Sequence, residues 1–151
     1  MDTRKSSAFL LYGVFAVFLS SANVAYGESA PCALLTQNQV STIVGASVGA
    51  GSPIANTGCS WTTTAAPRVT ATVSMQNEKM FAAVRSSTPP NTTKTSISRI
   101  GDEAIFTGVQ SFSSLWVRKG ATFVLFRIYG LPVSEAQTKL EALAKNGLSK
   151  L

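Results

Sequence analysis

The chain contains only two cysteines, Cys32 and Cys59, and their positions constrain its fold more than any other feature of the sequence. Cys32 precedes a segment with a helical pattern, whereas Cys59 begins residues 59–64, a segment typical of a β-strand. A disulfide bond between them would tie the first helix to the first strands of a sheet. Closing a loop of about 28 residues would stabilise the fold by roughly 3–4 kcal/mol, because it restricts the unfolded chain.

Residues 1–27 have the pattern of a secretory signal peptide. Arg4 and Lys5 form a short basic region, residues 8–19 form an apolar run, and Ala25 and Gly27 are the small residues that a signal peptidase reads. An uncleaved membrane anchor is the alternative, but it needs about 20 apolar residues and this run is shorter. The sequence therefore predicts cleavage after Gly27 and an exported chain of residues 28–151, periplasmic or secreted, without a transmembrane segment.

Two other interpretations of the cysteines remain open, a redox pair and lipid attachment at Cys32. A redox pair usually has the spacing C-x-x-C, which is absent. Lipid attachment needs a cysteine directly after the apolar region with a small residue before it, whereas Cys32 lies well beyond that region and follows Pro31. Two cysteines in an exported chain most simply pair with each other, so the sequence favours a structural disulfide.

Capping patterns predict three helices in the mature chain. The first begins after Thr36, which forms a capping box with Gln39, and ends at Gly45. The second begins after Asn77 and presents an apolar face of Met80, Phe81 and Val84. The third begins with a capping box of Ser134 and Gln137 and ends at Asn146 and Gly147.

Alternating and β-branched segments between these helices predict strands. Residues 59–64 and 68–75 indicate an antiparallel hairpin, and residues 97–107 hold a turn between two short strands. Residues 46–58 indicate a loop with a short edge strand around Val48, and residues 89–96 an exposed loop. A hairpin of residues 113–118 and 121–129 follows, and its second arm is apolar on both faces, as in a central strand. The order predicts one α+β domain, a mainly antiparallel sheet with helices packed on it.

Four short motifs give the chain a resemblance to a known family. In sequence order they are PCALLT at residues 31–36, GCSW at 58–61, IGDEA at 100–104 and LWVRKG at 115–120. Together they resemble a family of small exported bacterial envelope proteins, many of them lipoproteins, described as a domain of unknown function. The resemblance implies a PsbP-like α/β/α sandwich with paired cysteines, and it carries over no catalytic residue. This chain departs from the family's lipoproteins because it lacks a lipid-attachment cysteine.

The composition disfavours several kinds of chemistry. The chain has no histidine, which argues against catalysis by Ser-His or Cys-His pairs and against common zinc sites, so we expect no metal and no cofactor. The formal net charge is +6, which suits an anionic lipid or acidic glycan, but the basic residues are scattered as on an ordinary solvated surface. Export disfavours nucleic acid as a partner.

Two hypotheses of different classes follow. The first is a non-enzymatic module that binds an apolar ligand, a lipid or a protein partner of the envelope through the sheet face of residue 116 and strand 121–129. Its candidate ligand-binding residues are Trp116, Arg118, Phe126, Arg127 and Tyr129.

The alternative is an envelope hydrolase that uses Asp102 and Glu103, the only adjacent carboxylates of the chain, as acid and base. Neighbouring residues of a strand point to opposite faces, and an aspartate after Gly101 is more simply a turn residue, so we expect no catalytic residue.

Overall fold

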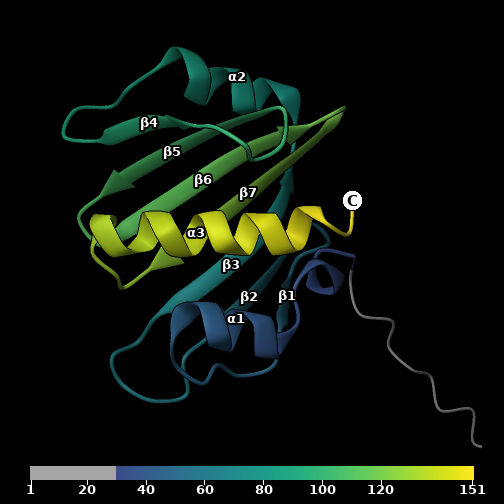
Figure 1. The fold of residues 1–151 in the computed structure, drawn as a ribbon, viewed down its shortest axis with the longest axis vertical. Coiled ribbons are helices and arrows are strands. Elements are labelled where there is room, and N and C mark those ends of the chain that lie inside the picture. The colour runs from purple at the N-terminus through teal and green to yellow at the C-terminus, as the bar shows by residue number, and fades with distance from the viewer. Residues whose placement is uncertain (1–29) are drawn as a thin grey trace, which may run out of the picture.

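The computed structural model describes residues 30–151, and the predicted signal peptide of residues 1–27 lies outside the described residues. Seven strands form one antiparallel sheet in the order β1-β2-β3-β7-β6-β5-β4 (Figure 1). The strands are β1 (Ser52–Ile54), β2 (Gly58–Thr62), β3 (Thr70–Gln76), β4 (Thr93–Ile97), β5 (Glu103–Val109), β6 (Phe112–Lys119) and β7 (Thr122–Tyr129). The helices are the 3-10 helix η1 (Cys32–Leu34), α1 (Gln37–Val44), α2 (Glu78–Ser86) and α3 (Val133–Leu148). The predicted α+β class with a mainly antiparallel sheet is confirmed.

One face of the sheet carries the main core. The long helix α3 crosses β5, β6 and β7 on this face, and α1 lies beside α3 (Figure 1). Val124, Phe126 and Ile128 alternate along β7 and join one buried cluster with Leu140 and Leu143 of α3. β7 is the middle strand of the sheet, so the prediction that it is central is confirmed.

The opposite face is covered only at one end, by α2. Phe81 of α2 packs in a second buried cluster with Ile105, Trp116 and Leu125. The strand register places these last three residues side by side on β5, β6 and β7, so they form one row across this face. Beyond this row the helix no longer covers the strands, and it is here that a site can form.

The disulfide between Cys32 and Cys59 is present, with an S–S distance of 2.01 Å, and the described residues contain no free cysteine. It joins η1 to β2, as the sequence predicts. Trp61, two residues after Cys59, is buried on the α1 and α3 face. Gly51 allows this packing, because a Cβ atom there would lie 2.9 Å from Nε1 of Trp61.

Helix α1 begins and ends as the sequence predicts, and α2 begins after its predicted cap, Asn77. The hydroxyl of Thr36 accepts a hydrogen bond from the N–H of Gln39, and the Gln39 side chain accepts one from the N–H of Thr36. Gly45 ends α1 with a φ of 85°. The side chain of Asn77 accepts a hydrogen bond from the N–H of Met80, although the Met80 side chain is exposed and not part of the apolar face.

The predicted capping box of α3 and its predicted C-terminal end are wrong, although Leu131 and Pro132 open the helix as the sequence indicates. The helix begins at Val133 after Pro132, and no side chain caps it, so Ser134 is already inside its first turn. At the other end, Gly147 lies within the helix, which continues to Leu148. A Cβ atom on Gly147 would lie 3.1 Å from the ring of Phe126, so this glycine allows close packing on the sheet and does not terminate the helix.

The two edge strands also differ from the prediction. Val48 forms only one isolated bridge, with Thr63, and the edge strand is β1, four residues later. Residues 93–96, expected in a loop, belong to β4, the opposite edge. Edge strands are short and polar, so they lack the alternation of buried residues by which strands are recognised.

Candidate functional site

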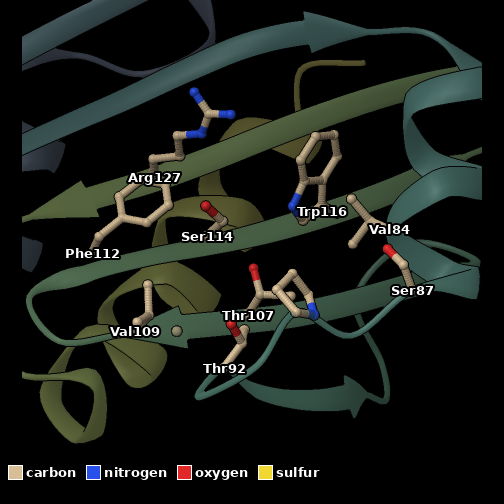
Figure 2. Close-up of a pocket in the computed structure, with 11 residues that line it drawn as sticks. Val84, Ser87, Thr92, Thr107, Val109, Phe112, Ser114, Trp116 and Arg127 are labelled. Atoms are coloured by element: carbon tan, nitrogen blue, oxygen red, sulfur yellow. The ribbon is translucent and has the colours of Figure 1, made fainter.

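A pocket of about 310 Å³ lies on the half-covered face, between the sheet and the segment that follows α2 (Figure 2). Its floor is formed by side chains of β5, β6 and β7, and its wall by the end of α2 and the loop before β4. The floor includes Thr107, Ser114, Trp116 and Arg127, and the wall includes Val84 and Pro89. Ligand sites range from about 300 to 1,000 Å³, so this pocket suits a small molecule.

The strand register arranges the floor in cross-sheet rows. Thr72 on β3 lies opposite Arg127 on β7, Arg127 lies opposite Ser114 on β6, and Ser114 lies opposite Thr107 on β5. These four polar residues form one row that crosses the middle of the sheet. The adjacent row contains Tyr129 on β7, Phe112 on β6 and Val109 on β5. The pocket floor therefore places a polar row between this second row and the Trp116 row.

Arg127 is the unusual member of the polar row. Its side chain is half-buried on the middle strand, and its Nε atom is buried without a hydrogen-bond partner. Its Cζ atom lies 5.8 Å from the centre of the Phe112 ring, close enough for a weak cation–π contact. None of the three ion pairs found in residues 30–151 includes Arg127. A partly buried cation without a counter-charge is unfavourable for folding, which makes Arg127 a candidate binding residue.

The other half-buried basic side chains all have a carboxylate or carbonyl partner. Within the described chain, Arg118 pairs with two carboxylates, and three lysines donate to backbone carbonyls. Those lysines are Lys94, Lys119 and Lys139. Among the half-buried basic side chains of residues 30–151, only Arg127 has neither a carboxylate nor a carbonyl partner.

Two hydroxyl groups of the floor are available to a ligand. The hydroxyls of Ser87 and Thr92, in the wall, are already used, because they donate to the carbonyls of Ala83 and Pro90 respectively. Ser114 is buried in the floor, next to Arg127 in the row, and Thr107 lies beside it. Neither Ser114 nor Thr107 hydrogen-bonds through its hydroxyl to another residue of the described chain. Figure 2 shows Ser114 between Arg127 and Thr107 on the pocket floor.

The structure brings together only some of the five residues that the sequence suggested for ligand binding. Trp116 and Arg127 line the pocket. Tyr129 lies next to the pocket, with its ring 4.9 Å from that of Phe112. Phe126 is fully buried on the opposite face against α3, and Arg118 lies at the far end of β6 in ion pairs, so neither reaches the pocket.

Sequence reasoning missed several pocket residues. Phe112 and Ser114 alternate with Trp116 along β6, so a period of two would have placed all three on one face. Thr107 faces the pocket because it lies opposite Ser114, a pairing that the sequence does not reveal. The wall depends on the path of the loop after α2, for which the sequence holds no signal beyond its prolines.

Asp102 and Glu103 lie outside this pocket and are occupied by other contacts. Asp102 precedes β5, accepts a hydrogen bond of 2.7 Å from the N–H of Gly120 and lies 3.5 Å from Arg118. Glu103 lies 3.8 Å from Arg118 and 3.6 Å from Arg85. The two carboxylates therefore share one arginine. Asp102 lies in a turn, as the sequence indicated, but its side chain bonds the distant N–H of Gly120 and so joins the turn before β5 to the turn between β6 and β7.

No group of three or more histidine, cysteine, aspartate or glutamate side chains in residues 30–151 could hold a metal ion. None of the helices in this part of the chain is long and apolar enough to span a membrane.

Comparison of the chain with protein-family models, with curated proteins and with solved structures found no match. The pocket itself is therefore the basis on which a function can be argued.

Proposed function

We propose that the protein is a non-enzymatic binding module that holds a small, largely apolar ligand in the pocket over β5, β6 and β7. The observation that carries this proposal is the unequal cover of the sheet. On one face α1 and α3 cover the main core, whereas on the other face α2 packs on the sheet at one end only. The pocket begins where that cover ends, and Trp116 belongs both to the α2 cluster and to the pocket lining.

A ligand at this place would complete the cover of the sheet. Trp116, Phe112, Val109 and Val84 offer apolar surface, and burying such surface is favourable by about 25 cal/mol per Å². Most ligand sites combine an apolar lining with a few polar groups that fix orientation, and the polar row supplies those groups. This arrangement favours an acyl chain or a single ring over a large oligosaccharide.

We also propose that this binding takes place outside the cytoplasm, in the periplasm or after secretion. The disulfide supports this location, since such bonds persist in oxidising compartments. The signal-peptide pattern of residues 1–27 supports it independently. The ligand would then be a component of the cell envelope or of its surroundings.

A thermal-shift screen of the oxidised protein against fatty acids, anionic phospholipids and envelope glycans tests the proposal. A ligand at about 100 times its dissociation constant stabilises the protein by roughly 2.7 kcal/mol, which raises the midpoint by several degrees. The Thr107→Phe variant should fold but lose this shift, because its ring fills the pocket. Thr95→Phe is the matched control, since Thr95 is an exposed residue of the edge strand β4 and lies outside the pocket. A shift that survives Thr107→Phe would place the ligand elsewhere.

A further inference from the structure

We infer that the ligand carries a single carboxylate, which pairs with Arg127 while the apolar part of the ligand fills the pocket. This inference rests on the proposed function and names its ligand class, a small monocarboxylic acid with an apolar body. The polar row and the charge of the pocket lining carry the argument.

The charge of the pocket suits a ligand that carries one negative charge. Arg127 is the only charged residue of the lining. Lys94, the next cation along the same row, faces Thr107 but donates to the carbonyls of Arg85 and Ser87 at 2.8 and 2.9 Å. An amine would place a second cation beside Arg127 without a counter-charge. A phosphate monoester, with up to two negative charges, would exceed the single cation that the pocket offers.

The shape of the guanidinium favours a carboxylate. Its planar set of N–H groups pairs with both oxygens of a carboxylate at once. In the row, Thr72 and Ser114 are the neighbours of Arg127 on either side, so the residues beside the guanidinium are uncharged and carry hydroxyl groups. Figure 2 shows the guanidinium directed away from Thr107 and Val109, which places the carboxylate at the rim of the pocket.

The volume limits the size of the apolar part. A pocket of about 310 Å³ holds the equivalent of about ten water molecules. A chain of about eight carbons or one aromatic ring is of that order. Phe112 stands beside Arg127 on the floor, so the first carbons after the carboxylate would lie against its ring.

Calorimetric titration with four probes that share one tail tests this inference: octanoate, octanol, octylamine and octyl phosphate. Octanoate should bind wild-type protein at least about tenfold more tightly than octanol, the range expected for charge-assisted hydrogen bonds. Arg127→Gln should remove that preference, so that octanoate and octanol bind this variant with similar affinity. Lys145→Gln is the control, because Lys145 is an exposed cation on the opposite side of the molecule, in the last turn of α3, and should keep it.

The outcomes separate this inference from the proposed function. Equal binding of octanoate and octanol, abolished by Thr107→Phe, would overturn the carboxylate and leave the pocket as a binding site. Tighter binding of octyl phosphate or octylamine than of octanoate would overturn it in the same way. If none of the four probes binds and the thermal-shift screen finds no ligand, both the carboxylic acid and the proposed function are contradicted. If none of the four probes binds but the screen identifies a ligand that Thr107→Phe excludes, only the carboxylic acid is contradicted.

Discussion

Arg127 occupies a position on the middle strand of a sheet where burial and the lack of a counter-charge are both costly. Its Nε atom is buried and unbonded, and its guanidinium lies over Phe112 without any carboxylate nearby among the described residues. Leaving a buried donor unbonded costs about 1–3 kcal/mol. A residue that does not stabilise the fold is expected to serve the function of the protein. For Arg127 we propose that this function is ligand binding in the adjacent pocket.

Replacing Arg127 by methionine tests this reasoning through stability. Arg127→Met keeps an apolar side chain against Phe112 and removes the unbonded donor, so the free energy of unfolding should stay the same or rise by about 1 kcal/mol. Arg118→Met is the matched control, and it should lower stability by up to about 1 kcal/mol because Arg118 pairs with Asp102 and Glu103. Urea denaturation measures both. A loss above about 1 kcal/mol for Arg127→Met would assign Arg127 a structural role.

At the scale of elements, lysines from other parts of the chain donate hydrogen bonds to carbonyls at the C-terminal ends of the three α-helices in residues 30–151. Lys139 of α3 donates to the last carbonyls of α1, at Ile43 and Val44. Lys94 of β4 does the same for α2 and Lys119 of β6 for α3. Each lysine satisfies carbonyls that a helix end leaves open and places a positive charge at the negative end of the helix dipole. Three of the 13 basic residues of the chain therefore hold helices to their neighbours.

Removing one of these lysines should weaken the whole fold. Lys139→Met leaves two carbonyls of α1 without their donor and should lower the free energy of unfolding by about 1–2 kcal/mol. Lys145→Met, six residues later in the same helix, changes an exposed lysine and should stay within about 0.5 kcal/mol of the wild type. Thermal denaturation of both variants gives the comparison. Equal stability of the two would show that the α1 cap contributes nothing.

At the scale of the whole molecule, the disulfide fixes η1, and with it α1, to the half of the sheet that α3 does not cross. Cys32 is the first residue of η1, which leads into α1, and Cys59 is fully buried in β2. The bond therefore joins the beginning of the described chain to the main core.

Loss of this bond should be the largest single cost to stability. The Cys32→Ser, Cys59→Ser variant should lose roughly 3–4 kcal/mol, as expected for a closed loop of about 28 residues. Octanoate should still bind the folded fraction, because the pocket lies on the other face of the sheet. Chemical denaturation with and without the ligand measures both effects. Unchanged stability would mean that the bond adds nothing to the fold.

Features that depend on short stretches of sequence, such as helix caps and apolar strands, could be predicted from the sequence. The capping box at Thr36, the central position of β7 and the pairing of the two cysteines are confirmed. Sequence reasoning misplaced the end of α3, because Gly147 is required by contact with Phe126 and not by a helix end. It also assigned Phe126 to the ligand site together with Trp116, although alternation along paired strands places them on opposite faces.

The pocket could be predicted only in part, for a similar reason. Trp116 and Arg127 were predicted because the segment 121–129 is apolar on both faces and basic residues lie in and beside it. Thr107 and Ser114 became visible only when the register placed them beside Arg127. Long-range pairing of strands and the path of the loop after α2 depend on tertiary contacts, which the local pattern does not contain.

The central claim is that the half-covered face of the sheet binds the ligand, and the two tryptophans allow one direct test. Trp116 lines the pocket, whereas Trp61 is buried in the core of the opposite face. The oxidised protein, labelled with fluorotryptophan, is titrated with octanoate and followed by fluorine NMR, with Trp116→Phe to assign the two signals. The account predicts that the Trp116 signal shifts in a saturable manner while the Trp61 signal stays in place. A stationary Trp116 signal while octanoate binds would contradict it.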